Sequence, residues 1–145
     1  MKRFFVLLAL SAGMLSCTNG GSTTEAENTE VSATEKVDAA KKEVMVIHDK
    51  TMAQMGEMGQ LTTKLKAAAV EATDTAAIYN AINDLAQAKD SMMDWMHNFE
   101  NPDEMEISEE EKVEYLNAEK AKMTDIAEYT NRSIDKAKEV LAKQN

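Results

Sequence analysis

Apolar residues recur at helical spacing from about residue 34 to the C-terminus, without the alternation that is typical of strands. Three segments carry this pattern, at about 34–71, 75–100 and 108–143. The most regular stripe, in the second segment, consists of Ile78, Ala81, Ile82, Leu85, Ala88, Met92, Met96 and Phe99. The sequence therefore predicts an all-α fold, an antiparallel three-helix bundle with short connections. A dimer in which a second copy supplies a fourth wall is the alternative.

Two polar breaks separate the predicted helices. In the first break, Thr73 or Asp74 is the expected N-cap of the second helix. The second break holds Pro102, the only proline, and is followed by "SEEE" at 108–111. Ser108 and Glu111 have the spacing of a capping box, so we expect the third helix to begin there.

The N-terminus reads "MKRFFVLLALSAGMLSC" and has the order of an export signal: two basic residues, a short apolar run and small residues. The run is too short for a membrane-spanning helix. "MLSC" resembles the lipobox of bacterial lipoproteins, in which the cysteine is acylated and the chain is cut immediately before it. The resemblance implies a signal peptide at 1–16 and lipidation at Cys17. An ordinary secretory signal is the alternative, but Cys17 is the only cysteine and has no disulfide partner within the chain.

Residues 17–33 are rich in Gly, Ser, Thr and Glu and predict a disordered tether, which leaves 34–145 as the bundle domain. Because the signal holds two basic residues, its removal changes the formal net charge from −10 to −12. This acidic balance argues against binding to nucleic acid and against adhesion to anionic lipid. The lipobox resemblance instead implies that a lipid anchor holds the protein in the cell envelope. We expect it at the outer membrane rather than the inner one, facing the periplasm or the surface.

Two segments hold most of the methionines, both histidines and the only tryptophan: "VMVIHDKTMAQMGEMG" at 44–59 and "DSMMDWMHNF" at 90–99. In the predicted hairpin they face each other as one layer, with His48 directed inward and His97 off the apolar stripe. One imidazole with several thioethers suits Cu(I) and does not suit zinc. The alternative, which we favour, is a methionine-packed core. The candidate metal ligands are His48, Met52, Met55, Met92 and Met96.

Other residues of this layer have structural interpretations. Gly56 and Gly59 cost helix propensity, which predicts close helix approach, around the ring of Trp95. Lys89 and Glu119 are expected at one level of the bundle, as an ion pair between helices. A haem held by His48 and a methionine is disfavoured, because the chain has no C-x-x-C-H attachment sequence.

Enzyme signatures are absent from the sequence. It contains no G-x-S-x-G, no Gly-rich phosphate loop and no H-E-x-x-H, and lipidation would remove the only thiol. The acidic residues form no pair that stands out as buried, so acid–base catalysis has no candidate residues. We expect a non-enzymatic protein that requires no cofactor. Its expected partners are the membrane, through the anchor, and an envelope protein or a second copy.

The lipobox, the polar tether, "HDKTMAQMGEM" and "MMDWMHNF" together resemble small envelope lipoproteins of Bacteroidota. Those proteins carry a similar His-Asp-x-x-Met-x-x-Met-Gly segment and a later Met-Met-x-Trp-Met segment, and the likeness is clearest over 44–99. It implies a location and a helical fold, not an activity. The leading hypothesis is a lipid-anchored helical bundle that binds a partner or has a structural role. The alternative is a periplasmic copper-binding protein.

Overall fold

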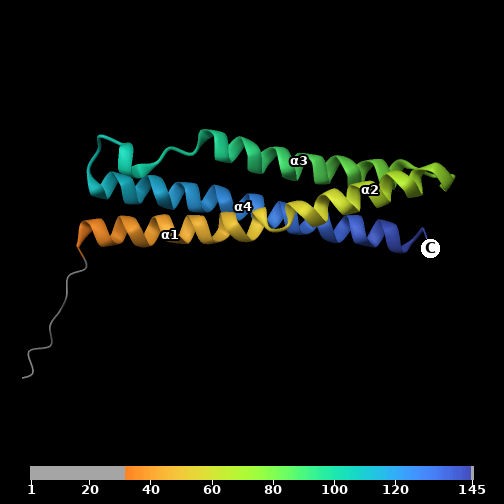
Figure 1. Ribbon diagram of the computed structural model, residues 1–145, viewed down its shortest axis with the longest axis horizontal. Helices are drawn as coiled ribbons and strands as arrows, with labels where there is room; N and C mark the ends of the chain where they lie inside the picture. The colour runs from red at the N-terminus through yellow and green to blue at the C-terminus, as the bar shows by residue number, and fades with distance from the viewer. Residues whose placement is uncertain (1–31, 145) are drawn as a thin grey trace, which may run out of the picture. The chain divides into compact units, whose positions relative to one another are not determined.

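The computed structural model describes residues 32–144, which form four α-helices and one 3₁₀ turn. Figure 1 shows α1 and α2 following each other along the bundle, α3 returning beside them and α4 running back along the full length. The element bounds are α1 Ala33–Met52, α2 Met55–Glu71, α3 Ala76–Asn98, η1 Pro102–Glu104 and α4 Glu109–Ala142. The prediction of an antiparallel three-helix bundle is confirmed, with α1 and α2 together as its first arm. The predicted signal, Cys17 and the tether up to residue 31 lie outside the described residues.

The first predicted helix is interrupted at Ala53 and Gln54, without a proline or glycine at the break. The hydroxyl of buried Thr51 donates to the carbonyl of Ile47 at 2.9 Å, a bond of the kind that bends helices. The next turn tightens, because the N–H of Gln54 donates to the carbonyl of Thr51 at 3.1 Å, only three residues back. The Gln54 side chain also donates to Asn131 of α4 at 2.7 Å. Side-chain hydrogen bonds therefore set this break.

Capping boxes open α1 and α4. The N–H of Glu111 donates to Ser108 Oγ at 3.3 Å and the N–H of Ser108 donates to Glu111 Oε2 at 2.9 Å, which confirms the predicted box. Ser32 and Glu35 form a second box, with distances of 3.2 and 2.8 Å, so that α1 begins at Ala33. Hydrogen bonds from the backbone of each serine favour the ionised carboxyl and lower the pKa of Glu35 and Glu111.

The turn between α2 and α3 has a looser start. Thr75 occupies the N-cap position without a side-chain cap bond, whereas Thr73 or Asp74 was predicted there. Asp74 does contribute, because its carboxylate accepts from the N–H of Ala76 at 3.0 Å. The second predicted helix, which is α3, therefore begins one residue later than the sequence predicts.

The core consists of two clusters along the bundle. The aliphatic cluster joins α2, α3 and the C-terminal part of α4; its buried residues are Met58, Leu61, Leu65, Ile78, Ala81, Leu85, Ala88, Ile134, Ala137 and Val140. The methionine–aromatic cluster joins α1, the C-terminal part of α3 and the N-terminal part of α4; its buried residues are Val37, Val44, Met92, Trp95, Leu116 and Met123. Thr130 and Ser133 are buried on α4 between the two. The predicted methionine layer belongs to the second cluster.

The register between α3 and α4 differs from the prediction, and the expected ion pair between Lys89 and Glu119 is wrong. Lys89 is exposed, whereas Glu119 is buried and contacts Trp95. The reason lies in the connection. The Tyr115 hydroxyl accepts from the N–H of Glu100 at 2.8 Å and donates to its carbonyl at 3.2 Å, which holds α4 beside the chain that follows α3. This displaces the pairing of the two helices by several residues.

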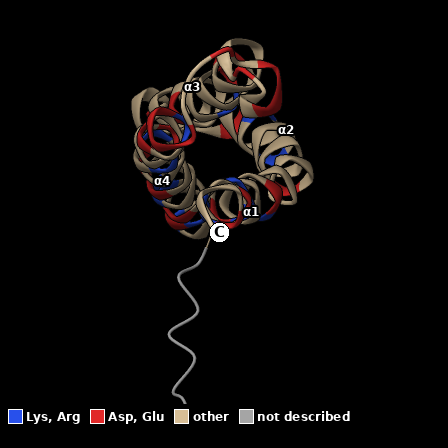
Figure 2. Cartoon of the chain, turned by 90° about the vertical axis from the view of Figure 1, so that its left-hand side faces the viewer, with Lys and Arg blue, Asp and Glu red and all other residues tan. Residues whose placement is uncertain are grey.

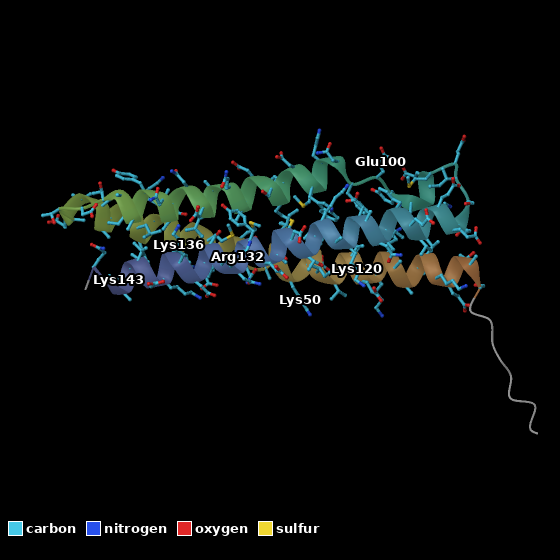
Figure 3. The ribbon with its side chains drawn as sticks, turned by 180° about the vertical axis from the view of Figure 1, so that it is seen from behind. Lys50, Glu100, Lys120, Arg132, Lys136 and Lys143 are labelled. Carbon is cyan, nitrogen blue, oxygen red and sulfur yellow. The ribbon has the colours of Figure 1, made fainter. Side chains whose placement is uncertain are left out.

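Ion pairs join α4 to each of the other helices. Lys120 pairs with Glu43 of α1 at 2.5 Å, and Lys136 pairs with Asp84 of α3 at 2.6 Å; both lysines are labelled in Figure 3. Lys138 pairs with Glu57 of α2 at 2.7 Å. Acidic and basic residues occur on every helix (Figure 2). Because the lysines are largely exposed, each pair contributes little free energy, and packing holds the bundle together.

Candidate functional site

A line of rings crosses the methionine–aromatic cluster from α1 to α4. The ring of His48 lies 5.5 Å from that of Trp95, Trp95 lies 4.8 Å from Phe99, and Phe99 lies 6.0 Å from Tyr115, measured between centroids. The His48 side chain is only 15% exposed, which confirms its predicted inward direction. His97 is exposed, as predicted. The layer therefore contains one imidazole.

The orientation of the His48 ring is set by its neighbour in the chain. Its Nδ1 atom lies 3.0 Å from Oδ1 of Asp49. Because an ionised carboxylate only accepts hydrogen bonds, Nδ1 carries the hydrogen in the neutral ring and Nε2 keeps its lone pair. Carboxylates hold metal-binding histidines in this way. The arrangement leaves Nε2 chemically able to bind a cation.

The predicted methionines lie with this histidine in one cluster. Met52, Met55 and Met96 are partly buried and pack against the methionine–aromatic cluster, and Met92 is fully buried within it. Met55 also packs against the aliphatic cluster. Figure 3 shows sulfur atoms near the middle of the bundle. The five predicted residues thus lie in or beside one cluster, and metal binding by them stays a prediction.

A buried hydrogen bond that the sequence did not predict fixes Trp95. Its indole N–H donates to Oε2 of Glu119 at 2.8 Å, and Glu119 is only 5% exposed. Lys122 donates to the other carboxylate oxygen at 2.6 Å, which raises the pKa of that lysine. The available signal was an acidic residue on the apolar face of the third helix, opposite the only indole. The carboxylate is thus satisfied at both oxygens and restrains the indole plane.

The structural interpretation of the two glycines is wrong. Gly56 and Gly59 are exposed, and a Cβ atom at either position would meet no atom within 4 Å. The face of α2 that packs on α3 and α4 consists instead of Met58, Leu61 and Leu65. The glycines lie on the outward side of α2, where they allow no close helix contact around Trp95.

Two surface features involve α3, the helix that carries Trp95. An open groove between α3 and α4 has Trp95 and Glu119 in its lining, together with Ser91, Asp94, Asn98, Lys122, Asp125 and Ile126. On the outer side of α3, the side chains of Tyr79 and Met93 are 55% and 48% exposed. Both features involve α3, which carries two of the five candidate ligands, Met92 and Met96.

Within residues 32–144, no three His, Cys, Asp or Glu side chains are placed to share a metal ion. None of the helices in this range is long and apolar enough to cross a membrane.

No family model, curated protein or solved structure that was compared with the chain matches it. The resemblance to envelope lipoproteins, carried by the segments at 44–59 and 90–99, therefore stays a prediction. The features of the molecule that bear on its function are the line of rings and the exposed side of α3.

Proposed function

We propose that the protein is a non-enzymatic lipoprotein of the bacterial cell envelope whose helical bundle binds another envelope protein. The first 17 residues would supply the anchor, through acylation of Cys17 after removal of the signal. Acyl chains bury many methylene groups, so such an anchor holds a protein on the membrane without a charged surface. The capping box of Ser32 and Glu35 supports this arrangement, because it starts the bundle where the polar segment ends.

The observation that supports the binding role is a row of exposed Tyr, Ala and Met residues on α3. Its inner stripe includes buried Ile78, Leu85 and Met92. The residue after each of these, Tyr79, Ala86 and Met93, is apolar in character and exposed. These three follow each other at intervals of seven residues and so lie on one side of the helix. We name Tyr79, Ala86 and Met93 the outer stripe.

The outer stripe has the composition of an interface. Tyrosine and methionine are enriched where proteins meet, because they supply large contact areas. In this chain two such side chains remain about half exposed on the helix whose other face is well packed. A helical segment of a partner fits a stripe with seven-residue spacing, because that spacing is the one along which paired helices keep contact. Self-association of the chain is an outcome that the test below distinguishes.

The anchor is tested by fractionation of cells that express the full chain with Cys17→Ser. We expect the variant to leave the membrane fraction and to lose labelling by radioactive palmitate. Ser22→Ala, in the polar segment, is the matched control and should stay membrane-bound and labelled. Membrane retention of Cys17→Ser with labelling intact would contradict lipidation at this residue.

Binding is tested by a photoreactive phenylalanine analogue placed at Tyr79 or Met93 of the full chain in its own host. Lys50 is the control position, because its side chain is exposed and points away from the bundle in Figure 3. We expect one discrete cross-linked product from both stripe positions and none from Lys50, with the partner identified by mass spectrometry. Identical products from all three positions, or none, would contradict binding through the outer stripe. A product between two copies would replace the partner by self-association.

A further inference from the structure

We propose that the ring line contains a site for a soft monovalent cation, Cu(I) or Ag(I). The ligands are Nε2 of His48 and the thioether sulfurs of Met52 and Met96, and the cation lies beside the face of Trp95. The site goes beyond the proposed partner binding, because it uses the inner side of α1 and α3 and not the outer stripe.

His48 has a nitrogen atom available as a ligand. Asp49 lies 3.0 Å from Nδ1 of His48 and holds the tautomer in which Nε2 is free to bind. Asp49 itself is largely exposed, so this orientation involves no buried charge on the carboxylate side. The ring is mostly buried against Trp95, which excludes water from much of its surface.

The four predicted methionines differ in how well they are placed to supply sulfur ligands. Met52 lies one helical turn after His48, and side chains at that spacing are neighbours on one face. Met96 is partly buried, directly follows Trp95 in the chain and packs against the same cluster. Met92 is fully buried as a core side chain, and Met55 lies at the boundary between the two clusters. Of the four predicted methionines, Met52 and Met96 therefore combine partial exposure with a place close to His48 or Trp95 in the chain.

Trp95 borders the proposed site. A cation within about 6 Å of the centroid of an indole ring is attracted by its negative face. The rings of His48 and Trp95 lie 5.5 Å apart with an angle of 36° between their planes. The proposed site uses the part of His48 that borders the indole. The hydrogen bond to Glu119 at 2.8 Å keeps the indole plane in place. Trp95 is thus a positioned wall of the site.

The chemistry of this set selects the ion. Thioethers with one imidazole favour Cu(I), whereas zinc requires more nitrogen, thiolate or carboxylate ligands. Among residues 32–144, no group of three His, Cys, Asp or Glu side chains offers a competing site. The acidic balance of the chain also attracts cations in general.

The experiment is a titration of the detergent-solubilised full chain with Ag(I), in chloride-free buffer, followed by fluorescence. Trp95 is the only tryptophan, so quenching reports directly on this site. We expect saturation at one ion per chain. His48→Ala should weaken binding by more than about 100-fold and Asp49→Asn by about 10-fold, since loss of a supporting carboxylate typically costs 10–100-fold. Met52→Leu and Met96→Leu should each weaken it, with little change in packing.

Matched controls lie on the exposed side of α3. His97→Ala removes the other histidine, and Met93→Leu removes a methionine of the outer stripe; both should leave the affinity unchanged. Circular dichroism checks that each variant keeps its helix content. Wild-type affinity in both His48→Ala and Met52→Leu would overturn the site, as would an equal loss in His97→Ala.

A second readout does not depend on fluorescence. Competition for Cu(I) with a chromophoric chelator measures affinity in Trp95→Phe as well, and we expect that variant to bind several-fold more weakly. Unchanged affinity there would overturn the role of the indole. The substitutions at His48, Met52 and Met96 leave the outer stripe intact. Cross-linking to the partner at Tyr79 should therefore persist in these variants when Ag(I) binding is lost.

Discussion

The two core clusters differ in the way in which their helices meet. In the aliphatic cluster α2, α3 and α4 all pack on one another, and the interior is filled by Leu65, Ile78 and Leu85. In the methionine–aromatic cluster α1 packs mainly on α4, as α3 does, and long or aromatic side chains such as Met92 and Trp95 fill the layer. Branched aliphatic side chains have few rotamers, whereas methionine adapts to irregular space. The difference separates a half filled mainly by branched aliphatic side chains from a half filled by methionine and aromatic side chains.

The largest effect should come from truncation of the aliphatic cluster. We expect Leu65→Ala to destabilise the bundle by about 3 kcal/mol, because it leaves a cavity among close-packed side chains. Met92→Ala should cost less, about 2 kcal/mol, because the flexible neighbours can collapse into the space. Urea unfolding followed by circular dichroism measures both, with Val46→Ala, at an exposed position, as the control. A greater loss from Met92→Ala would reverse the comparison.

The next effect tests the polar contact of the methionine–aromatic cluster. Glu119→Ala leaves the buried indole N–H of Trp95 without its acceptor and should cost about 2 kcal/mol. Glu119→Gln keeps an acceptor oxygen and should cost less. Denaturant unfolding gives the free energies, and near-ultraviolet circular dichroism reports the environment of Trp95. Equal losses in the two variants would mean that charge, and not the hydrogen bond, matters at this position.

The boundary between the clusters should yield a stabilising substitution. The hydroxyl of Thr130 is buried and has no hydrogen-bond partner within the described part of the chain. Thr130→Val removes this unsatisfied group and should raise stability by about 1 kcal/mol. Thr51→Val is the control, because the hydroxyl of Thr51 does have an acceptor, the carbonyl of Ile47. Thermal unfolding that shows a loss for Thr130→Val would indicate that a bound water satisfies the hydroxyl.

The helix starts provide a further contrast, because α1 and α4 carry capping boxes and α3 has no side-chain cap bond at its N-cap position. Ser108→Ala removes the acceptor for the N–H of Glu111 and should cost about 1 kcal/mol. Thr75→Ala, at the start of α3, should change little. Thermal unfolding measures both variants. Equal losses of stability would mean that the side-chain cap of α4 contributes no more than the uncapped start of α3.

The smallest effect is a dependence on pH. The pKa of Glu35 and Glu111 is lowered from the ordinary value of 4.5 in the folded chain, so their stabilising contribution is present above that value and lost as pH falls below it. We expect the melting temperature to fall less steeply in acid for the double variant Glu35→Gln, Glu111→Gln than for the wild type. Hydrogen exchange should show acid fraying first at the starts of α1 and α4. Identical acid profiles would exclude a role for the boxes.

The methionine layer shows how far sequence arithmetic extends. Helical spacing placed His48 inside and His97 outside, and both positions are confirmed. The spacing failed for Glu119, which lies on α4. The residue of α3 that faces it depends on the path of the chain after Asn98, and spacing within helices does not predict that path. It also failed for Gly56 and Gly59, since low helix propensity alone does not say which side a residue faces.

By itself the sequence determined the helices, their main polar breaks and the box at Ser108, because these depend on interactions within a few residues. Only the tertiary structure decided the break at Ala53, the partner of Glu119 and the position of Asp49 beside His48. The first depends partly on the contact of Gln54 with Asn131, and the second depends on the contact of Trp95 with Glu119, both between segments far apart in the chain. The third depends on the side-chain rotamers of His48 and Asp49, which the spacing of residues along a helix does not specify. Packing between helices therefore set the chemistry of the candidate site on a scaffold that local patterns had already defined.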